Sequence, residues 1–246
     1  MANDKELYAN QWSNSANDFY ESGAYSWMCE NIKEYKTVLE IGCGTGRSTL
    51  ALVETGHKVI AVEKNEYCLQ QASELLKEKG YKVTSRIEEI NDCDVVFIQD
   101  DVVDKNFQEN ISAIKFDVVI CWNVGSYWNK EMKTYYLPYM IEYGLTIPQI
   151  RSDQESSYAE LITWTSCKIA SNKGIPVQIV DRLGEYINEK NDTYYVTLKK
   201  EFDFSSIEYK HKETTTISKG GRALVVKGIV QRSERIKTIL TSIVMR

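Results

Sequence analysis

Apolar runs alternate with amphipathic segments through the first half of the chain. The runs "VLEI" (38–41), "HKVIAVE" (57–63), "DVVFIQ" (94–99) and "FDVVICW" (116–122) are mostly apolar and rich in β-branched residues. Such runs are typical of parallel strands covered on both faces. The segments "STLALVETG" and "EYCLQQASELLKEKG" have a helical pattern and end at glycines. This alternation predicts an α/β protein with a doubly wound sheet and right-handed crossovers.

The segments around this core predict its cover. The first residues favour helices, around "ANDFYESGAYSWMCENI". Residues 126–150 do not continue the alternation of strands and helices. After them, the pattern predicts a helix over 154–172 and a fifth strand in "IPVQIVDRL". We expect one domain over 1–246. Its parts are an N-terminal helical cap (1–36), a cofactor-binding half (37–125), a cap insertion (126–150) and a C-terminal half (151–246).

The last third changes character. The segments "TYYVTLKKEFDF" (193–204), "SIEYKHKETTTI" (206–217) and "RALVVKGIVQR" (222–232) alternate apolar and polar residues, as antiparallel strands with one wet face do. A glycine turn in "ISKGGRAL" separates two of them. Residues 232–246 fit either a helix or an edge strand, and we favour the strand. The expected sheet is mostly parallel and seven-stranded, with an antiparallel C-terminal portion.

Composition excludes several classes of protein. Hydrophobic residues make up 43% and charged residues 26% of the chain, as in an ordinary globular protein. No apolar run reaches the roughly 18 residues that a membrane span needs, and the N-terminus is too polar for a secretory signal, so we expect a cytoplasmic protein. The net charge of −5 argues against a nucleic-acid partner. The six cysteines form no C-x-x-C pair, so we expect no metal. The oligomeric state is left open.

A glycine turn follows the first strand. Gly42, Gly44 and Gly46 form G-x-G-x-G, which lets the backbone approach a ligand without a Cβ in the way. Glu63 ends the next strand, where a carboxylate can accept hydrogen bonds from ribose hydroxyls. NAD and S-adenosylmethionine both satisfy these features. Glu40 decides between them, because its carboxylate would oppose a pyrophosphate and attract an ammonium and a sulfonium.

Together, "VLEIGCGTG", "VIAVEKN", "IQDDVVD" and "FDVVICWN" resemble the class I S-adenosylmethionine-dependent methyltransferases, over roughly residues 37–124. The resemblance implies a Rossmann-like fold and S-adenosylmethionine as cofactor. It also implies a role for each matching residue. Glu40 would face the methionine amino group, the backbone from Gly42 through Cys43 and Gly44 would follow the cofactor, Glu63 would bind the ribose, and Lys64 would lie beside the adenine. Asp101 with Val102 would contact the adenine, with Asp100 as the alternative acid, while Trp122 and Asn123 would lie where the methyl group is delivered.

The segment after the fourth strand bears on the substrate. Adenine methyltransferases of nucleic acids carry two prolines after an Asn or Asp, whereas Val124 and Gly125 follow Asn123 here. Aminopropyl transferases share the core but carry an acid at this point. Aromatic residues gather on both sides of the cofactor motif, and such an enclosure suits a small organic substrate or a cationic amine. The candidate catalytic or substrate-lining residues are Tyr20, Tyr25, Asn123 and Tyr127, with Trp122 as a further lining residue.

Methyl transfer from a sulfonium needs mainly alignment in a dry cleft, so a protein base is optional. We expect His57 to be structural, and His211 to reach the site only if its sheet folds over it. A tyrosine or Glu21 is an equal candidate base. We expect residues 1–30 to lie over the cofactor and close the pocket around a small molecule. The alternatives are a methyltransferase acting on a protein or RNA, a non-catalytic S-adenosylmethionine-binding protein and, more distantly, a nicotinamide oxidoreductase.

Overall fold

The computed structural model describes residues 4–123, 132–217, 225–226, 229–230 and 235–246. Its first half contains β1 (Thr37–Ile41), α3 (Arg47–Glu54), β2 (Lys58–Glu63), α4 (Glu66–Glu78), β3 (Val83–Thr84), a 3-10 turn η1 (Ile87–Glu89), β4 (Val95–Gln99), α5 (Lys105–Ser112) and β5 (Val118–Trp122). Two helices precede them, α1 (Asp4–Glu21) and α2 (Ala24–Glu30). The predicted strand–helix alternation is therefore confirmed.

The second half adds α6 (Met132–Tyr143), α7 (Ile147–Ser152), α8 (Gln154–Lys173), β6 (Val177–Leu183), α9 (Tyr194–Glu201), β7 (Ile207–Thr216) and β10 (Ile236–Met245). The short strands β8 (Val225–Val226) and β9 (Ile229–Val230) form a separate antiparallel pair. The glycine turn expected within "ISKGGRAL" falls on 217–224, of which only 217 lies within the described residues.

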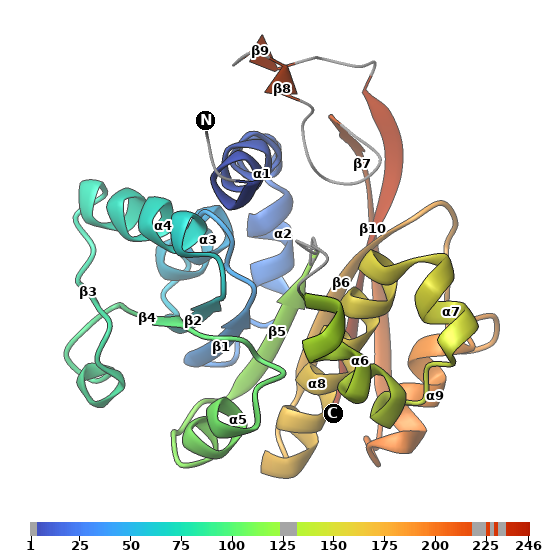
Figure 1. The fold of residues 1–246 in the computed structure, drawn as a ribbon. Helices are drawn as coiled ribbons and strands as arrows, with labels where there is room; N and C mark the ends of the chain where they lie inside the picture. The colour runs from blue at the N-terminus through green and yellow to red at the C-terminus, as the bar shows by residue number, and fades with distance from the viewer. Residues whose placement is uncertain (1–3, 124–131, 218–224, 227–228, 231–234) are drawn as a thin grey trace.

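Figure 1 shows one sheet with helices on both faces, in the strand order β3-β4-β2-β1-β5-β6-β10-β7. The strands from β3 to β6 are parallel, and β10 runs antiparallel between β6 and β7. The sheet has eight strands where the sequence predicted seven, and one of them is the two-residue edge strand Val83–Thr84 beside β4. The last residues form the strand β10, as favoured, but β10 is not an edge strand, because it pairs with β6 on one side and with β7 on the other.

Two apolar layers hold the sheet between its helices. One face packs on α2, α3 and α4 through residues such as Met28, Leu50 and Leu76. The other face packs on α5, α6, α8 and α9, with Phe107, Tyr158 and others in its core. In the described residues, no helix is both long and apolar enough to cross a membrane.

One segment differs from the sequence expectation. Residues 194–201 were expected in an antiparallel strand and form the helix α9 instead. The buried Tyr195 and Leu198 are three residues apart, as on one helix face, and the Asp192 carboxylate accepts hydrogen bonds from the backbone N–H groups of Tyr194 and Tyr195 at 2.9 and 3.1 Å. The mixed spacing of apolar residues permitted both readings, and this cap favours the helix.

Candidate cofactor and substrate site

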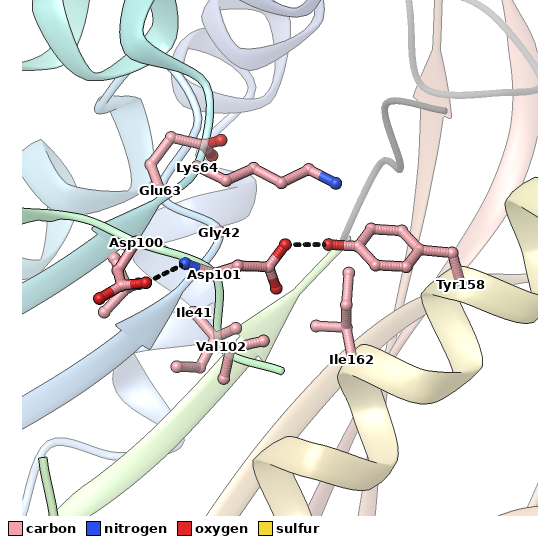
Figure 2. A pocket seen from close by; sticks show the side chains of 10 residues that line it. Ile41, Gly42, Glu63, Lys64, Asp100, Asp101, Val102, Tyr158 and Ile162 are labelled. Carbon is pink, nitrogen blue, oxygen red and sulfur yellow. Dashed lines mark hydrogen bonds between the residues drawn. The ribbon is translucent and has the colours of Figure 1, made fainter. Parts of the chain in front are cut away.

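The carboxyl ends of the parallel strands enclose a narrow cleft (Figure 2). Its lining combines residues that are far apart in sequence: Ile41 and Gly42 at the end of β1, Val62, Glu63 and Lys64 at the end of β2, Asp100, Asp101 and Val102 after β4, and Tyr158 and Ile162 on α8. The cavity volume is about 50 Å³. This is the place where an open parallel sheet binds ligands, outside the strand ends where the strand order reverses.

The glycine turn is shaped by close contacts on two sides. Gly42, Gly44 and Gly46 all have positive φ angles, of 74, 53 and 85°. A Cβ on Gly44 would lie 2.3 Å from Nε1 of Trp12, and one on Gly46 would lie 2.8 Å from the Ala72 backbone. These two glycines therefore allow α1 and α4 to approach the turn, in addition to any ligand contact.

Glu63 ties the ends of β1 and β2 together. Its carboxylate accepts hydrogen bonds from the Gly44 N–H at 3.1 Å and from the Asn65 N–H at 2.8 Å. Burial raises the pKa of this carboxyl group, while the two backbone hydrogen bonds oppose the shift. The side chain lines the cleft, so its position is compatible with the ribose contact predicted from the sequence.

Glu40 lies deeper than Glu63. Only 3% of it is exposed, and its carboxylate accepts hydrogen bonds from the Ser48 hydroxyl and, at 2.6 Å, from the Thr49 hydroxyl at the start of α3. Burial raises its pKa to about 7, and the two hydroxyl donors oppose this shift. The Glu40 carboxylate thus holds β1 against α3, and it does not line the cleft.

Two tyrosines reach Asp101 from the opposite wall. The hydroxyls of Tyr136 on α6 and Tyr158 on α8 both donate hydrogen bonds to Oδ2 of Asp101, at 2.9 Å for Tyr158. Figure 2 shows the contact of Tyr158. The Lys64 ammonium lies 3.8 Å from the Tyr158 ring centroid and 5.3 Å from that of Tyr136. Burial lowers the pKa of Lys64 to about 8, although Asp101 and Glu63 oppose the shift. The sequence did not identify Tyr136, Tyr158 or Ile162, because helical periodicity gives no sign of which helix meets the cleft.

The remaining predicted site residues lie around the cleft. Val102 lines it, whereas Cys43 is buried with its thiol pKa raised by burial. Trp122 points into the α2 side of the sheet, where its indole donates a hydrogen bond to Gln178 Oε1 at 3.0 Å. Asn123 is 3% exposed with a φ of 46°, and neither of its amide atoms has a hydrogen-bond partner within the described residues.

The candidate aromatic residues before β1 lie outside this cleft. Tyr25 is buried and stacks on Trp122 with 6.4 Å between ring centroids. The hydroxyl of Tyr20 donates to both Glu54 oxygens near the end of α3, and burial with this acceptor raises its pKa to about 12. Glu21 is exposed at the end of α1. Tyr127 lies outside the described residues.

The two histidines also have defined positions. Nδ1 of His57 lies 2.8 Å from the Tyr35 carbonyl oxygen, on a side chain that is 5% exposed, which fits the structural role expected for it. His211 lies on β7, cross-strand from Thr241 of β10, and its ring meets Tyr186 edge-on. β7 continues the same sheet beyond β10 and β6.

Comparisons with known proteins complete this description. Residues 38–137 match a family model described as a methyltransferase domain. No curated protein matches the chain. A putative RNA methyltransferase from Pyrococcus horikoshii is 14% identical, with 99% of this chain and 98% of that chain covered and a TM-score of 0.47. Magnesium protoporphyrin IX methyltransferase from Synechocystis, solved with bound S-adenosylmethionine, is 12% identical, with 99% and 85% covered and a TM-score of 0.46.

The family match begins at β1 and extends into α6, so it includes the glycine turn, Glu63 and Asp101. The strand order, with one antiparallel strand between β6 and β7, agrees with the fold that the sequence motifs implied. Residues 38–137 therefore form a methyltransferase domain, of the S-adenosylmethionine-dependent class I that the motifs implied, with S-adenosylmethionine as cofactor.

Proposed function

We propose that the protein transfers the methyl group of S-adenosylmethionine to a small organic molecule. The observation that carries the proposal is the cleft that joins Gly42, Glu63, Asp101 and Tyr158 beneath α6 and α8. The helix α6 comes from the segment between β5 and β6, and its Tyr136 hydroxyl donates to Asp101 across the cleft. Such an inserted cover suits an enclosed site, which favours a small substrate over a macromolecule.

The donor set fits the cofactor. The Glu63 and Asp101 carboxylates accept from ribose hydroxyls and an adenine amino group, and Val102 supplies an apolar neighbour. The Lys64 side chain reaches across the cavity to the Tyr158 ring, on the side where we propose that the adenine lies. Glu40, joined to α3, supplies negative charge beneath the turn for the methionine ammonium. Asn123 lies at the end of the adjacent strand β5, beside the position proposed for methyl delivery.

The cofactor, when bound, supplies an electrophilic methyl group. The nucleophile's lone pair forms the new bond to the methyl carbon while the carbon–sulfur bond breaks and its electron pair stays on sulfur. Any proton on the nucleophile leaves to solvent or to a neighbouring acceptor. The residues of this chain align the reactants and exclude water, which accounts for much of the barrier reduction in such displacements. We propose a single domain with α1 and α2 as an N-terminal cap and α6 and α7 as an inserted cap.

The proposal is tested by measuring binding and turnover separately. Calorimetry is expected to detect S-adenosylhomocysteine binding, with NADH as the negative comparison. Radiolabelled S-adenosylmethionine is then offered with pooled small metabolites, with total RNA and with denatured protein in separate reactions. Label in the small-molecule fraction supports the proposal. Label only in RNA or protein would overturn the substrate class, and binding without transfer to any fraction would indicate a non-catalytic protein.

A further inference from the structure

A row of polar residues crosses four neighbouring strands at one level of the sheet. Asp181 of β6 pairs directly with Thr241 of β10, and Thr241 pairs with His211 of β7. Asn123 follows β5 and donates its backbone N–H to the Val180 carbonyl at 2.8 Å, which places it beside Asp181. Residues paired directly in antiparallel strands share a face of the sheet, so the side chains of Asp181, Thr241 and His211 lie on the same face.

Three members of this row have buried polar atoms without a partner. Within the residues that the structure describes, no hydrogen bond reaches Oγ1 of Thr241, Nε2 of His211 or either amide atom of Asn123. Thr241 is 0% exposed and Asn123 is 3% exposed. Buried polar atoms in native proteins almost always have a partner, and each exception calls for an explanation. These unpartnered atoms flank Asp181: Thr241 and His211 lie on one side of it in the sheet and Asn123 on the other. Asp181 lines the cavity described next, and the three flanking residues do not.

A cavity lies on this face of the sheet. Its volume is about 230 Å³, and its lining includes Asp181, Glu160 of α8, and Tyr194 and Tyr195 of α9. The Tyr195 hydroxyl donates to Oδ2 of Asp181 at 3.1 Å, and the Tyr143 hydroxyl lies 3.5 Å from Oε2 of Glu160. Two carboxylates and two tyrosine rings thus surround a space large enough for a small organic group.

The two carboxylates of this cavity have no cationic side chain in direct contact among the described residues. Neither Glu160 nor Asp181 forms an ion pair with a described Lys or Arg side chain. Arg182 follows Asp181 in the strand, so its side chain points to the opposite face, from which it still interacts electrostatically with Asp181 as well as with Tyr25 and Tyr8. Burial raises the pKa of Glu160, because its charged form loses solvation. A bound cation would offset that loss, and tyrosine rings attract cations by their π faces.

We propose that this cavity binds the substrate, and that the substrate carries at least one alkylammonium group held by Asp181 and Glu160. The inference rests on the proposed function for its catalytic meaning, because it names the substrate class of the same site. β5 lies between β1 and β6 in the sheet, so Asn123 separates the Gly42 end of the cofactor cleft from Asp181. Adjacent strands are about 4.8 Å apart, which places the two sites roughly 10 Å from each other.

The test uses three ligands of similar shape and different charge. Phenethylamine, 2-phenylethanol and 3-phenylpropionate are titrated into the full chain saturated with S-adenosylhomocysteine, with calorimetry as the readout. We expect the amine to bind at least about tenfold more tightly than the alcohol, with no binding of the carboxylate. Asp181→Asn and Glu160→Gln keep the side-chain shapes and should each weaken amine binding by about tenfold. Glu88→Gln, at an exposed position beyond β3, is the control and should change nothing.

Equal binding of the three ligands would overturn the proposal, and so would no amine binding at millimolar concentration. Unchanged amine affinity in both cavity variants, with melting curves like the parent's, would also overturn it. The same titrations report on the proposed function separately. If S-adenosylhomocysteine binds while the amine does not, the cavity proposal fails and the methyltransferase reading stands. If the amine binds but S-adenosylhomocysteine does not, the cavity is an amine site and the proposed methyl transfer is wrong.

Discussion

The Trp12 indole packs directly on Gly44, so that a Cβ on the glycine would lie 2.3 Å from Nε1 of the tryptophan. This contact fixes α1 over the glycine turn, and Trp12 is 6% exposed. Around it, Asn65 donates to the Lys5 carbonyl at 3.0 Å and Arg47 donates to Asn17 at 2.5 Å. The N-terminal helix is therefore joined to the turn, to α3 and to the start of α4.

We predict that S-adenosylhomocysteine slows hydrogen exchange in residues 10–30 as well as in the glycine turn. The reason is that α1 packs on Gly44, so local unfolding of the turn also exposes α1. Deleting residues 1–22 should leave a folded core with weakened cofactor binding and no methyl transfer. Protection confined to 42–46 would contradict the idea that α1 acts as a cover.

Glu63→Ala should weaken S-adenosylmethionine binding by about 1.5–3 kcal/mol, the scale of hydrogen bonds to a charged group. The variant also removes the acceptor of the Gly44 N–H, so a melting curve should accompany the calorimetry. Glu66→Ala is the matched control, because this nearby carboxylate is exposed and lies 3.9 Å from Lys5. Equal affinities for the parent and Glu63→Ala in a folded protein would refute the ribose assignment.

Glu40→Gln should change both stability and cofactor discrimination. Burial raises the pKa of Glu40 from 4.5 in the unfolded chain to about 7. The unfolded chain therefore releases this proton first, and the carboxyl group destabilises the fold as the pH rises from 4.5 to 7. The isosteric amide does not ionise, so the variant should lose less stability than the parent as the pH rises from 5 to 8. Urea unfolding at pH 5 and pH 8 provides the measurement. No difference between the two pH values would mean that Glu40 is ionised throughout.

The same variant tests the ammonium contact. Affinity for S-adenosylmethionine should fall much more than affinity for adenosine, because adenosine lacks the amino acid end. Calorimetry with both ligands in two buffers of different ionisation enthalpy should also show proton release on cofactor binding near pH 6, since a neighbouring ammonium favours the charged carboxylate of Glu40. Equal losses for the two ligands would assign Glu40 to the fold alone.

Lys64→Met should remove a pH dependence of stability. The pKa of Lys64 falls from 10.5 to about 8 on burial, so between these values the unfolded chain holds more protons and the parent gains stability as the pH rises. The variant lacks this gain, and should be relatively more stable at pH 7 than at pH 10 when compared with the parent. Lys79→Met, at an exposed position, is the control for loss of a charge. Parallel stability curves for the parent and Lys64→Met would show that the ammonium is not desolvated.

The sequence was sufficient for the part of the fold whose signals are local. Apolar runs placed β1, β2, β4, β5 and β6, and the spacing of Gly42 and Glu63 located the cleft. Local signals failed at α9, where apolar residues at 194, 195, 198 and 202 fit two periods and a side-chain cap decides between them. The two-residue β3 is too short to leave a pattern.

The tyrosines that α6 and α8 contribute to the site could not be predicted from the sequence, for a different reason. Tyr158 meets Asp101 only because α8 packs across β5, and this contact joins residues 57 positions apart. The same holds for the row formed by Asp181, Thr241 and His211, which depends on the register of three strands. The aromatic clue also lay elsewhere than expected, since Tyr20 and Tyr25 pack away from the cleft while Tyr136 and Tyr158 line or close it.

The place of β10 in the sheet has a consequence for synthesis on the ribosome. β7 emerges before β10, yet its only neighbour in the described sheet is β10, which fills the gap between β6 and β7. In a nascent chain released before residue 236, the edge of β6 and the whole of β7 therefore lack their backbone hydrogen-bond partner β10. Unpaired strand edges of this kind can pair with other chains. The polar row at Asp181 is incomplete at that stage, because Thr241 arrives with β10. The proposed cavity is lined by residues of β5, α8, β6 and α9, so the whole of its lining is synthesised before the strand that completes the sheet.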